Sequence, residues 1–214
     1  NGCQEDSMLI WPSMQNSAAQ HPLGLRASSL EELFSKLAPQ RAHKGPLWFG
    51  ISGSWRKTSQ EVEDAVRTTV HRILERGDGI VSGGALSVDF FATDEALNLD
   101  PDATHIKIFL PVTLERYAAH YRKRASEGVV TLEQAEALIA QLEEIKRRNP
   151  SAVIENTANT IVDPTTYFAR NTEVVNASDA LIAFHVNESE GAQDTINKAL
   201  VQKKPVFINT YTIV

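Results

Sequence analysis

One stretch of the sequence decides the fold: Ile80-Val81-Ser82-Gly83-Gly84-Ala85-Leu86-Ser87-Val88-Asp89. Its first residues continue a short apolar strand that begins at Gly79, and the Ser-Gly-Gly turn ends that strand. We expect a helix from about Ser87 to Leu97. A buried strand that passes through a glycine turn into a helix is the repeating unit of an α/β sheet.

The same unit precedes this stretch. Residues 47–51 are an apolar run typical of a buried strand, and the turn Ser52-Gly53-Ser54 follows it. Thr58 and Glu61 have capping-box spacing, which predicts the start of a helix. Apolar residues then recur with helical period until Gly77, which is typical of a helix end.

Further apolar strands follow downstream, at residues 105–110, 180–184 and 205–208. The pattern of residues 151–162 does not distinguish short strands from irregular chain. Strands that alternate with helices pair in parallel through right-handed crossovers. We therefore predict an α/β fold with three layers, Rossmann-like, with a mainly parallel central sheet and a helical insertion.

The chain divides into two regions on these patterns. Residues 1–40 are expected to form an N-terminal arm and a short helix, which Pro39 stops. Residues 41–214 are expected to form the Rossmann-like domain, which opens with a basic linker reaching residue 46. The helical insertion in this domain covers about residues 112–150.

Composition and charge restrict the classes of function. The chain has 214 residues, 42% of them hydrophobic, with a formal net charge of −6 and a pI of about 5.5. A protein that coats nucleic acid neutralises phosphates with clustered Lys and Arg, so the acidic balance argues against nucleic acid as a partner. The amphipathic helices of the insertion are compatible with a homo-oligomer.

The sequence also bears on location and on metals. Cys3 is the single cysteine, which excludes an internal disulfide framework and a cysteine-built zinc site. No His, Asp and Glu spacing typical of a metal site is present. No apolar run has the length of a membrane span, and no signal peptide is recognised. We therefore expect a cytoplasmic protein without a membrane partner or a metal.

Three turns rich in Gly and Ser follow predicted strands: residues 52–54, 82–84 and 189–192. In an open parallel sheet, ligands bind beyond the carboxyl ends of the strands. Glycine lets the backbone approach a ligand, and the following helix offers free N–H groups to an anion. The turns therefore predict a pocket for a phosphorylated ligand, although glycine also closes ordinary short turns.

Other side chains near these turns have two interpretations, one as ligand-binding residues and one as structural or surface residues. Trp55 beside Arg56 can stack on a base, or can pack against the insertion. Arg170 can bind phosphate through its guanidinium, or can be a surface arginine. His185 follows the strand at 180–184 and is expected near the pocket rim.

Two longer stretches resemble the SLOG superfamily. Residues 80–89, continued through Ala92 to Ala96-Leu97, are similar to its SGxAxGxD…A…AL motif. Residues 167–195 are similar to its segment of an Arg-Asn pair, a buried strand and a Gly loop before a helix. The group includes the DNA-processing protein A of bacterial transformation, "lonely guy" phosphoribohydrolases and molybdenum-cofactor carriers. The resemblance covers about residues 47–110 and 163–209.

The resemblance implies a Rossmann-like fold that binds nucleotides or ligands derived from them. It places phosphate-binding loops at two of the glycine turns, a motif aspartate at Asp89 and a motif arginine at Arg170. Together with the turns, it gives the expected ligand-binding residues: Gly53, Ser54, Trp55, Arg56, Ser82, Gly83, Gly84, Asp89, Arg170, Asn171, Ser189, Gly191, Ala192 and Thr195.

The sequence departs from the phosphoribohydrolase pattern at its essential glutamate. No Pro-Gly-Gly precedes the last loop, and Lys198 stands three residues past Thr195, where that pattern has Glu. We therefore favour a protein without this hydrolase activity. An enzyme would have to use Asp89 or Glu190 as its carboxylate.

Four hypotheses follow for the function. The leading one is a sensor or carrier of a nucleotide or nucleotide-derived phosphorylated ligand. The alternatives are an enzyme that cleaves nucleotides, like an N-glycosidase or phosphoribohydrolase; a molybdenum-cofactor carrier that binds a pterin phosphate; and a nucleic-acid module, which the acidic charge disfavours. If the insertion folds over the sheet edge, some of its basic residues reach ligand phosphates: Arg116, Arg122, Lys123 and Arg124.

Overall fold

The computed structural model describes residues 25–214, so most of the predicted N-terminal arm lies outside the described residues. Within this range seven strands form a single sheet in the order β1-β7-β6-β2-β3-β4-β5, and every pair is parallel. This confirms the predicted α/β Rossmann-like fold. The strands are β1 (Arg26–Ala27), β2 (Trp48–Gly53), β3 (Gly79–Ser82), β4 (Ile106–Leu110), β5 (Val153–Glu155), β6 (Ala180–Val186) and β7 (Val206–Tyr211).

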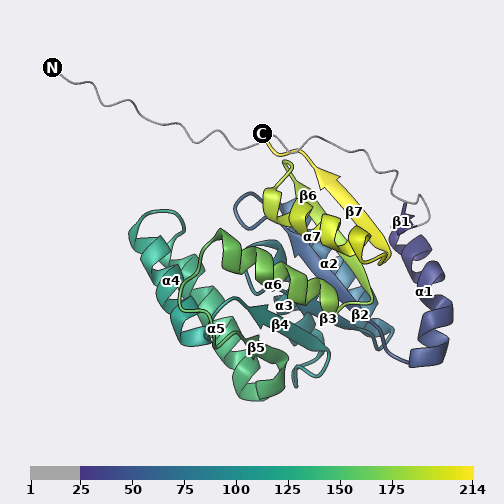
Figure 1. The fold of residues 1–214 in the computed structure, drawn as a ribbon, viewed down its shortest axis with the longest axis horizontal. Coiled ribbons are helices and arrows are strands. Elements are labelled where there is room, and N and C mark those ends of the chain that lie inside the picture. The colour runs from purple at the N-terminus through teal and green to yellow at the C-terminus, as the bar shows by residue number, and fades with distance from the viewer. Residues whose placement is uncertain (1–24) are drawn as a thin grey trace.

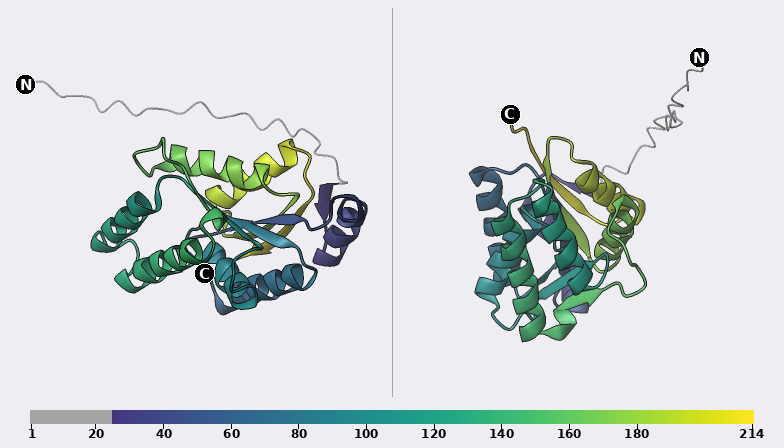
Figure 2. Two further views of the ribbon diagram at one scale, coloured as in Figure 1. Left: turned by 90° about the horizontal axis from the view of Figure 1, so that it is seen from below. Right: turned by 90° about the vertical axis from the view of Figure 1, so that its left-hand side faces the viewer.

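Helices cover both faces of the sheet (Figures 1 and 2). In the left view of Figure 2, α6 and α7 lie above the sheet and α2 and α3 lie below it. The α4–α5 pair stands at one end and α1 at the other. The helices are α1 (Leu30–Lys44), α2 (Gln60–Glu75), α3 (Val88–Leu99), α4 (Leu114–Ser126), α5 (Leu132–Arg148), the 3-10 helix η2 (Pro150–Ala152), α6 (Pro164–Asn176) and α7 (Glu190–Val201).

The central strands are buried because both faces of the sheet are covered. All seven residues of β6 are buried, and so are all four of β3. Phe49 of β2 pairs with Ile80 on one side and with Ala180 on the other, which fixes the register of the three middle strands. Near-continuous apolar strands of this kind are expected where helices lie on both faces.

Helix α1 is longer than predicted, because it continues through Pro39 to Lys44. The segment predicted to be a linker is therefore helical. Its side chains are fixed by two carboxylates: Arg41 binds Asp78, and Lys44 binds Asp179 at 2.6 Å. These tertiary contacts stabilise the last turns of the helix, which continue past the interior proline.

Two smaller expectations are also corrected. Helix α2 is capped by Ser59, whose side chain accepts from the Val62 N–H, and not by Thr58. His185 does not lie at a pocket rim, because β6 extends to Val186 and His185 is buried within it. Of the open segment, residues 153–155 form β5.

Lys204 ties the end of α6 to the start of β7. Its ammonium donates to the carbonyls of Val175, Asn176 and Ser178 at the C-terminal end of α6. A cation there satisfies carbonyls that lack helical partners and complements the helix dipole. We expect Lys204→Met to lower the free energy of unfolding by about 1–2 kcal/mol, measured by urea denaturation. Lys203→Met at the exposed neighbour is the control, and equal losses in both variants would contradict this role.

Candidate functional site

A cavity of about 610 Å³ opens beyond the carboxyl ends of the central strands. Its walls come from the loop after β2, the turn after β3, α4, α6 and the start of α7. This is where an open parallel sheet is expected to bind a ligand. The predicted residues that line it are Gly53, Ser54, Trp55, Arg56, Gly83, Asp89, Arg170, Asn171, Ser189, Glu190, Gly191, Ala192 and Thr195.

Two of the predicted ligand-binding residues do not line the cavity. Ser82 is fully buried at the end of β3, and its hydroxyl accepts from the Gly84 N–H at 3.1 Å. Gly84 has a φ of +64° and packs against Ile108 and Leu110, where a side chain would not fit. Both residues determine the conformation of the turn, whereas Gly83 and Ala85 of the same turn line the cavity.

Several residues that line the cavity were not among the predicted ligand-binding residues. Tyr167 and Phe168 precede the motif arginine on α6, and His120, Tyr121 and Arg124 come from α4. Arg124 belongs to the basic group whose approach to the site was conditional on the insertion folding over the sheet edge, and α4 does reach the cavity. In the sequence, these aromatic residues only follow the apolar period of a helix. That pattern indicates that they are buried but does not indicate what they contact.

Asp89 organises the floor of the cavity. Its carboxylate accepts hydrogen bonds from the Gly83 N–H at 3.1 Å and the Ala85 N–H at 3.2 Å. Burial raises the pKa of the Asp89 carboxyl, whereas the Arg170 guanidinium and these two N–H groups act in the opposite direction. The first turn of α3 thereby fixes the glycine turn that precedes it.

Arg170 reaches the same turn from α6. Its guanidinium donates to the Gly83 carbonyl and lies 3.9 Å from the Asp89 carboxylate. Only 8% of its side chain is exposed. A Cβ on Gly83 would overlap the guanidinium, so glycine at this position makes room for Arg170.

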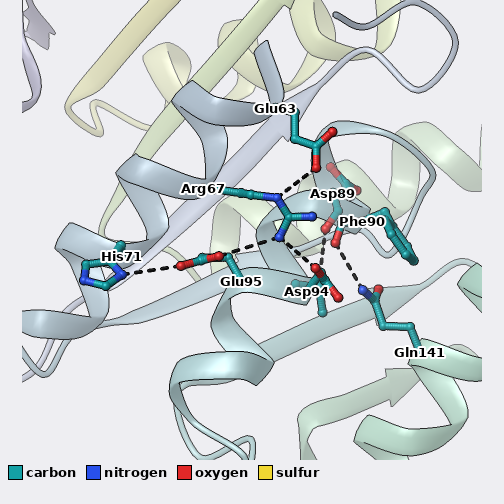
Figure 3. A network of polar contacts seen from close by, with 9 residues as sticks. Glu63, Arg67, His71, Asp89, Phe90, Asp94, Glu95 and Gln141 are labelled. Atoms are coloured by element: carbon teal, nitrogen blue, oxygen red, sulfur yellow. Dashed lines mark hydrogen bonds and ion pairs between the residues drawn. The ribbon is translucent and has the colours of Figure 1, made fainter. Parts of the chain in front are cut away.

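Helix α3, which carries Asp89, is itself fixed by polar contacts on both sides (Figure 3). Arg67 of α2 binds Asp94 of α3 at 2.7 Å. From the other side, Gln141 of α5 donates to the Phe90 carbonyl at 3.1 Å. The floor of the cavity is therefore coupled to the packing of three helices.

The start of α7 forms another wall. The Ser189 hydroxyl is buried and has no hydrogen-bond partner among the described residues. Gly191 faces open space, so its lack of a side chain is not required by packing. Lys198 binds Asp194 at 2.6 Å and the Phe168 carbonyl, and so joins α7 to α6.

Two exposed aromatic rings that line the cavity lie near cations. Trp55 is 36% exposed, and the Arg56 guanidinium lies 4.5 Å from the centre of its ring. Phe168 is 40% exposed, and the Lys198 ammonium lies 5.6 Å from its ring. His120 lies 3.5 Å from the Tyr167 hydroxyl, and burial, followed by the charge of Arg124, lowers its pKa.

A comparison with known protein families shows the family to which the chain belongs. The model of the family DNA recombination-mediator protein A matches residues 32–213. The chain belongs to this family. DNA recombination-mediator protein A lies within the SLOG superfamily, so the resemblance found in the sequence is confirmed.

Two solved structures of DNA processing protein A share the fold. One, from Helicobacter pylori, is described by its single-stranded DNA binding mode; it is 23% identical with a TM-score of 0.56. The other, from Streptococcus pneumoniae, is 18% identical with a TM-score of 0.52. Each alignment covers 76% of this chain, but only 65% and 50% of the two structures respectively. No curated protein matches the chain.

Membership in the DNA recombination-mediator protein A family corrects two predictions. The small phosphorylated ligand, expected as the partner of a sensor or carrier, is contradicted, and so is the argument against nucleic acid as a partner. The physical reason is that net charge averages over the whole surface. Arg56, Arg124 and Arg170 meet at one cavity, which Asp89, Asp163 and Glu190 also line, and other acidic residues such as Asp94 lie elsewhere on the fold.

Two further findings describe the chain between residues 25 and 214. No helix there is both long and apolar enough to cross a bilayer. No group of three His, Cys, Asp or Glu side chains lies close enough to hold a metal ion in that part of the chain.

Proposed function

We propose that this chain binds single-stranded DNA at the cavity beyond the carboxyl ends of the strands. The observation that carries the proposal is a pair of exposed rings that line the cavity, Trp55 and Phe168, with the Arg56 guanidinium beside Trp55. Proteins that bind single strands combine cations that follow the backbone with aromatic faces on which bases stack.

The family supports this proposal, because its description is recombination mediation and its Helicobacter pylori structure is described as binding single-stranded DNA. Arg56, Arg124 and the exposed Lys57 supply the positive charge near the cavity. A cytoplasmic location, expected from the sequence, fits a protein that handles DNA strands.

The first test measures binding of a labelled oligothymidylate of about 20 nucleotides by fluorescence anisotropy over a range of salt concentrations. We expect affinity to fall as salt rises, and a duplex of the same length to bind more weakly. If the protein shows no affinity for the single strand at low salt, the proposal is wrong.

The double variant Arg56→Ala/Arg124→Ala tests the rim. We expect affinity to fall about ten- to a hundredfold, because two charged contacts to phosphate are lost. The slope of log affinity against log salt should decrease by about 1.4, at 0.7 per phosphate contact with a single strand.

Arg147→Ala is the matched control, since Arg147 pairs with Glu144 in the last turn of α5, at the far end of that helix from the cavity. A similar loss in the control and in the double variant would place binding elsewhere.

A further inference from the structure

His120 lies on the wall that α4 contributes to the cavity. Its ring packs edge-on against two tyrosines, with centroid distances of 5.8 Å to Tyr121 and 6.3 Å to Tyr167 of α6. Its Nε2 lies 3.5 Å from the Tyr167 hydroxyl, at the outer limit of a hydrogen bond. The imidazole is therefore positioned by side chains of two helices at the surface of the proposed binding site.

His120 forms no ion pair with an acidic side chain in the described part of the chain. Two other histidines do have such partners there. His71 lies 3.4 Å from Glu95, and His105 lies 3.2 Å from Asp100. His120 thus lines the cavity without an anion of its own, whereas these two histidines are paired elsewhere on the fold.

The environment of His120 opposes its protonation in the free protein. Burial lowers the pKa of His120, and the charge of Arg124 acts in the same direction. Glu127 acts in the opposite direction, and Lys123 adds a smaller lowering effect. The facing group on α6 is the Tyr167 hydroxyl, which burial keeps neutral by raising its pKa. The imidazole is therefore uncharged at neutral pH and able to gain a proton.

The other elements around α4 carry charges as well. Helix α5 packs against α4, and its Glu136 is bound by Arg122 at 2.8 Å. The remaining charged side chains that line the cavity are Arg56, Asp89, Asp163, Arg170 and Glu190. The charges with the largest effect on the pKa of His120 lie on α4 itself.

His120 and Arg124 are neighbours on one face of α4. They are four residues apart in the helix, and both line the cavity. The proposed function assigns a phosphate of the strand to Arg124. A phosphate held there lies beside His120 and provides the anion that the imidazole lacks. A nearby anion favours the charged form of a histidine.

We propose that binding of single-stranded DNA at this cavity is coupled to proton uptake, with the His120 imidazolium joining Arg124 as a partner of the strand's phosphates. The proposal rests on the proposed binding of single-stranded DNA and adds its regulation by pH. The pKa of His120 is lowered in the free protein and is raised again by a bound phosphate. Affinity therefore increases as pH falls through the interval between these two pKa values, and stays constant above and below it.

The first test measures affinity for the oligothymidylate by anisotropy at about pH 8 and about pH 5.5, a range in which histidine titrates but thymine and the phosphodiester do not. At constant ionic strength, we expect affinity to be about three- to tenfold higher at the lower pH. The slope of log affinity against log salt should be steeper there by about 0.7, for one added phosphate contact. Affinity that does not depend on pH would overturn the inference and leave the proposed function standing. Absence of binding at both pH values would instead refute the proposed function.

Two substitutions identify the group that takes up the proton. His120→Gln keeps a polar side chain opposite Tyr167 but cannot become charged, so affinity should no longer depend on pH in this range. His71→Gln, in the α2–α3 network of Figure 3, is the matched control and should keep the full pH dependence. If His120→Gln, shown to be folded by circular dichroism, kept the pH dependence of the unmodified protein, the inference would be wrong.

A second measurement observes the proton on His120 directly. The ring signal of His120 is assigned in the proton NMR spectrum by its absence from His120→Gln, and is titrated with and without the oligothymidylate. We expect the pKa of His120 to be higher in the complex, and that of His71 to be the same in both states. A pKa of His120 that the strand leaves unchanged would contradict the proposal, even if affinity varied with pH.

Discussion

Gly83→Ala is expected to lower the free energy of unfolding by about 3–5 kcal/mol. The added methyl group would overlap the Arg170 guanidinium, which is buried and cannot stay in place. When Arg170 moves, the buried Asp89 carboxylate loses its ion-pair partner, and an uncompensated buried charge is strongly destabilising. Urea denaturation followed by circular dichroism measures the loss.

The backbone at Gly83 does not require glycine, since this residue is not among those with positive φ. The expected cost therefore comes from Arg170 and can be tested by a double-mutant cycle. In an Arg170→Ala background, the same Gly83→Ala change should cost less than about 1 kcal/mol, because the clash is gone. Additive costs in the double variant would show that the methyl group is harmful for another reason.

Gly83→Ala should also weaken binding of single-stranded DNA. The displaced guanidinium has to move toward the cavity that Gly83 and Arg170 line together. Affinity for an oligothymidylate, measured where the variant is fully folded, is expected to fall. Unchanged affinity would mean that the floor of the cavity does not contact the strand.

The arrangement of the site could be predicted because parallel strands share an edge. Gly53, Gly83 and Gly191 are far apart in the chain, yet each lies at or beyond the carboxyl end of a strand, so the topology brings them to one cavity. The apolar runs were enough to identify five of the seven strands described, whereas β1 was not predicted and the segment that contains β5 was left open. The capping boxes at Thr131 and Asp163 are signals of the same local kind, because each depends on residues only three positions apart.

Features that depend on distant contacts could not be predicted. The continuation of α1 beyond Pro39 depends on Asp78, which is 37 residues from its partner Arg41, and on Asp179, which is 135 residues from its partner Lys44. The glycine turn at residues 82–84 resembles a phosphate loop in sequence, but the Gly83 and Ala85 N–H groups donate to Asp89 of the next helix and the Gly84 N–H donates to Ser82. Local sequence patterns do not show which acceptor each backbone N–H group binds in the folded chain.

The nucleic-acid partner was missed for a related reason. A net charge of −6 describes the whole chain, whereas binding depends on the charge at one surface. On the surface formed by α2 and α3, acidic side chains outnumber the basic one, since Arg67 there is bound by Glu63, Asp94 and Glu95 (Figure 3). Only the fold separates this acidic face from the cationic rim.

Asp78→Ala is expected to cost about 3–5 kcal/mol of stability without reducing affinity for single-stranded DNA. The Asp78 side chain is 0% exposed and accepts from the Leu47 N–H at 2.9 Å, from Arg41 at 3.1 Å and from Arg76 at 2.9 Å. Its removal leaves a buried amide and two guanidinium groups without their acceptor. Urea denaturation measures the loss of stability, and anisotropy at low temperature measures binding by the folded variant.

The two results together separate the ends of the sheet. Asp78 joins α1, the end of α2 and the start of β2, at the amino ends of the strands, whereas the cavity lies at their carboxyl ends. We expect Asp78→Ala to lower stability alone and Gly83→Ala to lower both stability and affinity for single-stranded DNA. That outcome would show that the amino ends of the strands contribute to folding only, whereas the carboxyl ends also contribute to binding. If Asp78→Ala also weakened binding while fully folded, the strand would have to contact the amino ends of the sheet, and the cavity would be only part of the interface.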